Sequence, residues 1–178
     1  GDGARDGRAA TADAVEAAGG AGTTDELDVR DREAFEAAVD ATADEFGLDG
    51  LLNNAGVSHG RIAFEDVGDD ERDRVIDVNA KGVWNGCQAA LPHLREQGSG
   101  AVVNTASLAG VIGAPQLSAY SLSKGAVVNF TRTVAAEAGP DGVRVNAVCP
   151  GVVDTPMPRK GQTPEEWAQR KEEMSRHY

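Results

Sequence analysis

Tyr120 and Lys124, in the stretch SAYSLSKGAVVNF at residues 118–130, are two side chains whose types and spacing suit acid/base chemistry. Residues four positions apart lie on the same face of a helix, about one turn from each other. A free phenol is a poor base at neutral pH, and a nearby ammonium group favours the phenolate. The spacing predicts a proton-transfer pair, although by itself it also fits a tyrosine and a lysine on an ordinary surface helix.

Helical and strand patterns alternate along the rest of the chain. Helices are predicted at 5–18, 31–46, 68–97 and 119–138, and a polar helix begins near Thr163-Pro164 with Thr163 as its cap. Strands are predicted in TTDELDV, ending at Asp28, and in LDGLLNN, GAVVNTAS and VRVNAVCPG. This alternation predicts one doubly wound α/β domain over residues 1–178, with a parallel sheet covered by helices on both faces in three α/β/α layers.

The ends of the predicted strands carry polar or glycine-rich residues. These are Asp28, the NNAG turn at 53–56, Ser107 and Pro150-Gly151. Parallel α/β sheets bind ligands outside the carboxyl ends of their strands. We therefore expect these residues to line one shared cleft.

The composition argues against several classes of function. The 178 residues carry a formal net charge of −12 at pH 7 and no basic stripe, which disfavours a nucleic-acid partner. No apolar run approaches the roughly 18 residues of a membrane span. The first residues lack the apolar centre of a secretory signal, so we expect a cytoplasmic protein. Acidic residues spread over the helices suggest a salt-adapted source, a hypothesis that equal melting temperatures at low and molar salt would contradict.

The cysteines and histidines form no metal-ligand pattern. Cys87 and Cys149 stand singly in apolar surroundings, and we interpret both as buried, reduced thiols without a metal or disulfide role. The three histidines, His59, His93 and His177, show no ligand spacing. His59 follows a glycine-rich loop, and it either faces a site or lies on the surface.

The segments YSLSK, VVNTAS, NNAG, VNAKG and RVNAVCPGVVDTPM together resemble the short-chain dehydrogenase/reductase family, in its subgroup with a single Rossmann-like domain. The resemblance runs in unbroken order over nearly all 178 residues. It implies an oxidoreductase that transfers a hydride between NAD or NADP, with NAD favoured, and a secondary alcohol or ketone. The same resemblance implies a small-molecule substrate.

The resemblance implies roles in catalysis for four residues. Tyr120 would be the general acid/base on the substrate oxygen, and Ser107 would donate a hydrogen bond to that oxygen. Lys124 would favour the phenolate and bind the nicotinamide ribose, and Asn79 would hold a water in a proton relay to Lys124. Plainer alternatives are a cap of a local turn for Ser107 and a packing amide within the helix for Asn79.

The resemblance also implies a cofactor site, made by Asp2, Asp28, Asn53, Ala55, Gly56, Tyr120, Lys124, Pro150, Gly151, Val153 and Thr155. Asp28 would pair with the adenine amino group, and Asp2 falls where an acidic residue binds the adenosine ribose and selects NAD over NADP. Asn53, Ala55 and Gly56 would line the cofactor. A helix cap for 31–46 is the alternative for Asp28, a loop residue for Asp2, and a plain turn for Asn53 and its neighbour.

The end of the cofactor site nearest the substrate falls in the loop after the last predicted strand. Pro150 and Gly151 would open this loop under the nicotinamide, with Val153 and Thr155 at its carboxamide. A simple strand stop is the alternative for Pro150-Gly151.

Two parts of the family pattern are absent from the sequence. The family opens with a strand and a glycine-rich TGxxxGxG turn that holds the pyrophosphate, and it closes with a strand after the substrate helix. We interpret the 178 residues as a fragment; as a complete chain they would bind the cofactor poorly. We expect the full protein to supply the missing neighbours of the TTDELDV strand; the alternative is that this strand moves to pair with GLLNNAG. The alternative function is a truncated, inactive relative that serves as a binding or oligomerising module, or a gene remnant.

The resemblance also indicates where the substrate pocket and the subunit interface would lie. Ser58, His59, Gln116 and the segment 155–175 fall at variable positions that would line the substrate pocket, and Arg159 and Lys160 would meet an anionic group. Many family members pair the helices that match 68–97 and 119–138, which implies a homodimer or homotetramer. An epimerase or dehydratase of the extended subgroup also uses a Tyr-xxx-Lys pair, but NNAG and the single-domain length disfavour it.

Overall fold

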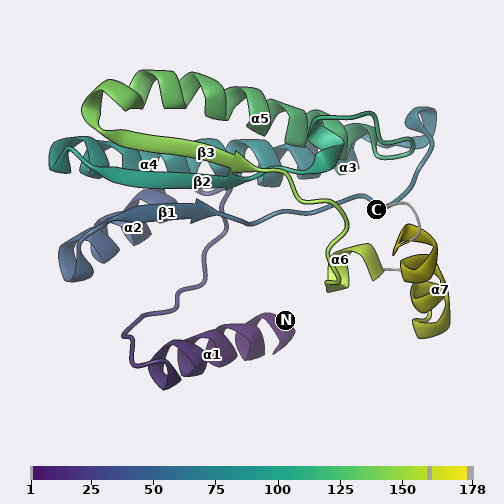
Figure 1. Cartoon of the computed structure of the whole chain (residues 1–178), viewed down its shortest axis with the longest axis horizontal. Helices are drawn as coiled ribbons and strands as arrows, with labels where there is room; N and C mark the ends of the chain where they lie inside the picture. The colour runs from purple at the N-terminus through teal and green to yellow at the C-terminus, as the bar shows by residue number, and fades with distance from the viewer. Residues whose placement is uncertain (1, 160–161, 176–178) are drawn as a thin grey trace.

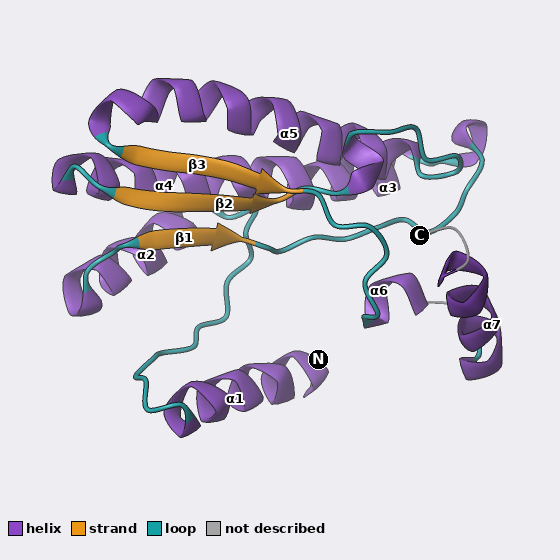
Figure 2. Cartoon of the chain, in the orientation of Figure 1, coloured by secondary structure: helices purple, strands orange, loops and turns teal. Residues whose placement is uncertain are grey.

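The structure, a computed structural model, describes residues 2–159 and 162–175, with side chains at 10–159 and 162–173. At its centre lies a parallel sheet of three strands, β1 (Gly50–Asn53), β2 (Gly100–Thr105) and β3 (Val143–Val148), in the order β1-β2-β3 (Figure 2). The register places Asn53 beside Asn104, and Val103 beside Asn146. The carboxyl ends of all three strands therefore meet at one edge of the sheet.

Two helical crossovers join the strands. The first consists of α3 (Asp69–Ile76), a π-helical turn (Asp77–Lys81) and α4 (Gly82–Gln97), and the second is α5 (Ser118–Ala138). Right-handed crossovers that step the same way across a sheet place their helices on the same face. Figure 1 shows α4 and α5 on one face, where α2 (Arg32–Phe46) packs against α4.

Burial along the strands agrees with this one-sided cover. Val143 and Val145 are buried, whereas Arg144 and Asn146 between them are exposed. The parallel sheet with flanking helices confirms the predicted Rossmann-like fold, as a partial sheet of three strands. The expected second helical layer is not among the elements that the structure describes. The hydrophobic core lies between the sheet and its helices and includes Phe35, Val39, Val83, Leu94, Val102, Val127, Val134 and Val145.

Three further helices lie away from this sheet. Helix α1 (Asp2–Ala17) is set apart below β1, and α6 (Pro156–Arg159) and α7 (Pro164–Ser175) follow β3 (Figure 1). The predicted cap of α7 is confirmed, because Thr163 Oγ accepts a hydrogen bond from the Glu166 N–H at 3.2 Å. Glu166 Oε2 accepts one in return from the Thr163 N–H at 2.8 Å, which completes a capping box.

The predicted strand in TTDELDV is wrong, and the alternative in which it pairs with GLLNNAG is not found in the described sheet. Residues 20–28 form no regular secondary structure. A strand exists only through hydrogen bonds to a neighbouring strand. Because β1 is an edge strand that pairs only with β2, this segment has no ladder in the described structure, and Leu52 on β1 is 62% exposed.

The predicted helix at 68–97 is present, but it is interrupted by the π-helical turn, which holds one more residue than an α-helical turn. Among the described helices, none has the length and apolarity of a membrane span. Within the same described residues, histidine, cysteine and carboxylate side chains form no cluster that suits a metal ion.

Candidate active site

Lys124 belongs to α5, and its side chain reaches the carboxyl end of β2. Its Nζ donates a hydrogen bond to the Thr105 carbonyl at 2.6 Å, and the residue is only 3% exposed. Burial lowers the pKa of Lys124 from 10.5 to about 8, because water stabilises an ammonium better than a protein interior does. An ammonium has three N–H donors and the bond to Thr105 uses one, so Lys124 can bind further acceptors.

Tyr120 and Lys124 share a face of α5, as their spacing predicts. Lys124 Nζ lies 6.0 Å from the centroid of the Tyr120 ring. A 3₁₀ turn, Leu108–Gly110, packs against this end of α5. A Cβ on Gly110 would lie 2.6 Å from the carbonyl carbon and oxygen of Lys124, so only glycine permits this close approach. The turn thereby fixes the position of the helix that carries both side chains.

Asn79 lies in the π-helical turn and is fully buried. Its Oδ1 accepts from the Val57 N–H at 2.8 Å, and its Nδ2 donates to the Val57 carbonyl at 2.9 Å. Nδ2 also donates to Ser123 Oγ at 3.0 Å, and Ser123 in turn donates to the Tyr120 carbonyl at 2.8 Å. The amide therefore makes the packing contacts expected of its alternative role, and these bonds link the loop after β1 to the helix that carries Tyr120.

Gly56 lies next to the polar groups of both Asn79 and Lys124. A Cβ on Gly56 would lie 3.4 Å from both Asn79 Oδ1 and Lys124 Nζ. The predicted cofactor-lining turn thus passes directly beside the two polar groups. Sequence reasoning missed Ser123, although its position directly before Lys124 and three residues after Tyr120 was a usable signal.

Ser107 occupies the loop after β2. Its Oγ accepts from the Ala109 N–H at 3.2 Å, so it caps the local turn. This bond uses the hydroxyl oxygen and leaves the O–H free to donate elsewhere. The Leu108 N–H donates to the Pro150 carbonyl at 2.9 Å, which holds the predicted Pro150-Gly151 loop beside the Ser107 turn.

Asn53 points into the protein rather than toward the loops. Its Nδ2 donates to Asn104 Oδ1 at 2.9 Å, and Asn104 Nδ2 donates to Thr131 Oγ1 at 2.9 Å. All three residues are buried, and Cys87 Sγ lies 3.6 Å from Asn53 Nδ2. This network ties β1 and β2 to α5, and it commits the Nδ2 group of Asn53 to partners inside the protein.

The two cysteines differ in environment. Burial raises the pKa of Cys87 to about 11, so its thiol stays neutral. Cys149 is exposed, and the expectation that it is buried is wrong. The reason is its place near the end of β3, in the loop that leaves the sheet at Pro150.

A cavity of about 190 Å³ lies between the end of β1, the segment before α2, and the start of α4. Its walls are mostly apolar, and it is lined by Leu27, Val29, Phe35, Leu52, Asn53, Asn54, Ala55, Val78, Gly82 and Val83. Asp28 stands between two of these lining residues in the chain. A small cavity with mostly apolar walls suits a flat, largely apolar part of a ligand.

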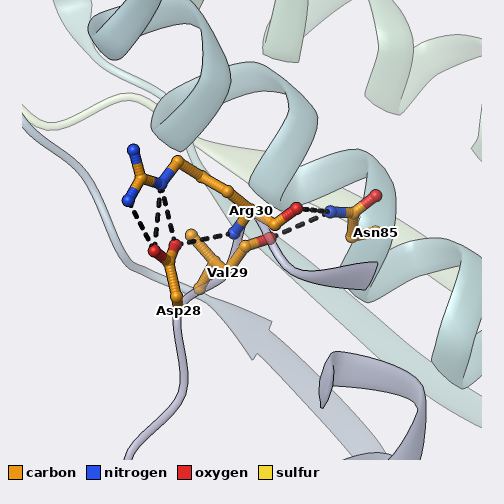
Figure 3. Close-up of polar contacts among 4 residues, drawn as sticks. All are labelled: Asp28, Val29, Arg30 and Asn85. Atoms are coloured by element: carbon orange, nitrogen blue, oxygen red, sulfur yellow. Dashed lines mark hydrogen bonds and ion pairs between the residues drawn. The ribbon is translucent and has the colours of Figure 1, made fainter. Parts of the chain in front are cut away.

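Asp28 itself forms an ion pair with Arg30 (Figure 3). Hydrogen bonds from the Arg30 side chain and backbone lower the pKa of Asp28 from 3.8 to about 2. The alternative in which Asp28 caps the following helix is wrong, because Asp31 is the cap and accepts from the Ala34 N–H at 3.0 Å. The side chain of Asp2 lies outside the described residues.

The predicted substrate positions come from two loops that meet. The Ile62 N–H donates to the Gln116 carbonyl at 3.0 Å, and Gln116 has the unusual backbone angle φ 66°. His59 is 9% exposed, so the alternative of a surface histidine is wrong. Both nitrogens of its ring are buried without a hydrogen-bond partner in the described structure.

Asp154 organises the segment after β3. It accepts from Arg159 Nε at 2.8 Å, from Trp167 Nε1 at 2.9 Å and from Lys171 Nζ at 3.1 Å. These bonds hold α6 and α7 together beside the exposed Val153. The charge of Arg159 is thus paired within the chain, and Lys160 lies outside the described residues. Sequence reasoning missed Asp154, although it is the one acidic residue between positions 142 and 164.

Comparisons with known proteins agree with this geometry. A family described as short chain dehydrogenase matches residues 2–166. The chain is 44% identical over 133 residues to 2-(R)-hydroxypropyl-CoM dehydrogenase of Xanthobacter autotrophicus, covering 73% of this chain and 53% of that protein. It is also 44% identical over 131 residues to levodione reductase of Leifsonia aquatica, covering 73% and 49%.

Solved structures give the same result. The crystal structure of levodione reductase superposes with a TM-score of 0.81 at 41% identity, covering 85% of this chain and 59% of that one. The structure of NAD+-bound xylitol dehydrogenase gives a TM-score of 0.80 at 35% identity, covering 83% and 57%. The chain spans about half the length of the curated relatives that it matches. Its sequence and its fold place the chain in the short-chain dehydrogenase/reductase family.

Proposed function

We propose that the whole protein is an NAD(P)-dependent oxidoreductase that acts on a secondary alcohol or ketone. The observation that carries this proposal is the buried Lys124 ammonium, which is held on the Thr105 carbonyl beside the Tyr120 ring. The relatives' names, which are those of dehydrogenases and reductases, support this class over an inactive binding module. Residues 1–178 would then form part of one catalytic domain.

A dinucleotide fits the described residues at both of its ends. The mostly apolar cavity lined by Leu27 and Val29, the neighbours of Asp28, suits the adenine base, with Asn53 and Ala55 also at its wall. Gly56 leaves space beside Lys124 Nζ, whose uncommitted N–H donors suit the hydroxyls of a ribose. The Pro150-Gly151 loop, with Val153 and Thr155 following it, would lie at the nicotinamide. When bound, the nicotinamide would supply or accept the hydride.

The proton steps belong to residues of this chain. Tyr120 would give its phenolic proton to the carbonyl oxygen in reduction, or take the hydroxyl proton in oxidation. The free O–H of Ser107 would donate to the same oxygen and stabilise its developing charge. Lys124 Nζ, 6.0 Å from the centre of the Tyr120 ring, would bring a positive charge near the reacting oxygen. A water held between Lys124 Nζ and Asn79 Oδ1 would complete a proton relay to Lys124. The two atoms lie close together, because each is 3.4 Å from the position that a Cβ on Gly56 would take.

The choice between NAD and NADP follows from separate observations. One solved relative is NAD+-bound xylitol dehydrogenase and another is ElxO with NADP bound, so the family accommodates both. We propose NAD for this protein, because Asp2 would repel a 2′-phosphate if it lies at the adenosine ribose. Comparing the KM for NAD+ with that for NADP+ tests this choice.

A homo-oligomer is part of the proposal. An apolar surface between α4 and α5 carries the exposed Trp84, whose ring lies 5.2 Å from that of Phe130. A pocket of about 190 Å³ opens on this surface. Exposed apolar patches of this kind mark interfaces. A sedimentation mass equal to one chain would contradict this part of the proposal.

Replacing Tyr120 with Phe tests the catalytic assignment. The variant keeps the aromatic ring beside Lys124 and removes only the phenolic hydroxyl. We expect NAD(H) affinity in calorimetry to stay within about twofold, while turnover of secondary alcohols falls by about 100-fold or more. Tyr178→Phe makes the same chemical change elsewhere and serves as the control. Turnover near the wild-type value for Tyr120→Phe would refute the assignment.

A further inference from the structure

The carboxylate of Asp28 is engaged by a single residue. Oδ1 accepts from the Arg30 N–H at 3.0 Å and from Arg30 Nε at 2.9 Å, and Oδ2 accepts from Nε at 3.1 Å and from a terminal guanidinium nitrogen at 2.6 Å. An ionised carboxylate has about four lone-pair sites. Three N–H groups of Arg30 make these four contacts, because both oxygens share the Nε–H, and together they occupy most of the acceptor sites of Asp28.

The backbone of this turn is fixed, while the Arg30 side chain is not. Asn85 Nδ2 donates to the Val29 carbonyl at 2.9 Å and to the Arg30 carbonyl at 3.4 Å, which attaches the turn to α4 (Figure 3). The Asp31 N–H donates to the Asp28 carbonyl at 2.9 Å. The Arg30 side chain is half exposed, and all its side-chain hydrogen bonds in the described structure go to Asp28. A change of rotamer at Arg30 is therefore enough to free most of the carboxylate.

We propose that Arg30 is a specificity-determining residue that covers Asp28 and must swing away before an exocyclic amine of a purine can donate to the carboxylate. The inference rests on the proposed function, because it takes the cavity beside Asp28 as the adenine site. It assigns to Arg30 a competition with the base for the same acceptors. The ion pair is exposed on both sides and screened by solvent, so it is weak enough to be displaced.

The proposal makes a prediction that distinguishes two ligands. Adenosine monophosphate carries the exocyclic amine, and purine ribonucleoside monophosphate lacks it. Arg30→Ala removes the cover and keeps the backbone N–H on Asp28. We expect this variant to bind adenosine monophosphate about 1.5- to 5-fold more tightly than the wild type does, as the loss of an exposed ion pair allows. Affinity for the ligand without the amine should not change.

The experiment is titration calorimetry of the whole protein at low ionic strength, with both nucleotides and with NAD+. Arg32→Ala is the matched control, because Arg32 is an exposed arginine of the neighbouring helix that pairs with Glu36 instead. A gain confined to the amine-bearing nucleotide in Arg30→Ala supports the inference. An equal gain for both nucleotides, no gain, or a loss of affinity overturns it.

The same titrations separate the inference from the proposed function. If NAD+ binds and Arg30→Ala leaves the ratio of the two nucleotide affinities unchanged, only the role of Arg30 is wrong. If neither NAD+ nor either nucleotide binds to any variant, the adenine site itself is wrong, and the inference falls with it.

Discussion

Replacing the buried Lys124 with Met should change how the protein's stability depends on pH. The wild-type ammonium is desolvated in the folded state, so the pKa of Lys124 falls from 10.5 to about 8. The unfolded chain then holds its proton more tightly than the folded protein does. By linkage, wild-type stability rises with pH between about 8 and 10.5, whereas the methionine variant lacks this contribution.

The size of this effect follows from the fall in pKa. At 1.36 kcal/mol per pKa unit, the free energy of unfolding of the wild type should gain about 3 kcal/mol relative to Lys124→Met across that range. At pH 7 the variant escapes the desolvation penalty but loses a charge-assisted hydrogen bond to Thr105, which contributes about 1.5–3 kcal/mol. The two terms nearly cancel there, so the slope with pH is the informative quantity.

The measurement is urea unfolding followed by circular dichroism, at a series of pH values from neutral to about the unfolded pKa of lysine. Lys81→Met is the matched control, because Lys81 is exposed and its pair with Asp77 raises its pKa above 10.5. The stability difference for the control should stay flat over this range. Parallel pH curves for the wild type and Lys124→Met would refute the desolvation argument.

Three further predictions concern the groups that support the site. Asn104→Ala leaves the buried amide of Asn53 without its acceptor and should lower the unfolding free energy by about 1–3 kcal/mol in urea titrations, and an unchanged midpoint would contradict the network. Gly110→Ala places a Cβ against the Lys124 carbonyl and should destabilise by about 1–3 kcal/mol, whereas Gly113→Ala meets nothing within 4 Å and should be near neutral. Asp154→Ala should release Trp167 from its hydrogen bond and shift its fluorescence to longer wavelength, measured with Trp84 replaced by Phe. Because the pKa of Asp154 is lowered to about 2, the wild type should show the same shift only as the pH falls from about 4 toward 2, and a shift near neutral pH would be contrary to this assignment.

The sequence predicts well what depends on neighbours along the chain. Helical spacing places Tyr120 beside Lys124, and Thr163 caps α7 as its type suggests. Three of the four predicted strands are present, because each is a short apolar run that helices bury on one side. These features depend on residues a few positions apart in the chain, so they can be predicted from the sequence pattern.

The remaining features depend on partners that are distant in sequence. TTDELDV has a strand-like pattern, but a strand needs a neighbour to bond with, and the described sheet offers none. The inward turn of Asn53 depends on Asn104, which lies 51 positions away. Asp154 gains its role only when Trp167 and Lys171 fold back onto it. Periodicity and residue type do not encode such pairings.

The π-helical turn also sets the rotational phase of one helix against the other. Each residue advances an α-helix by about 100°, so the extra residue of the π-helical turn at Asp77–Lys81 rotates α3 relative to α4. Deleting one residue there would permit an unbroken α-helix with better local hydrogen bonds. It would also rotate Arg74 away from the Ser58 carbonyl, to which it donates at 3.2 Å. In this segment the most regular helix and the correctly oriented helix are therefore different structures. A single-residue deletion would change the direction in which the α3 side chains point more than it would change the length of the helix.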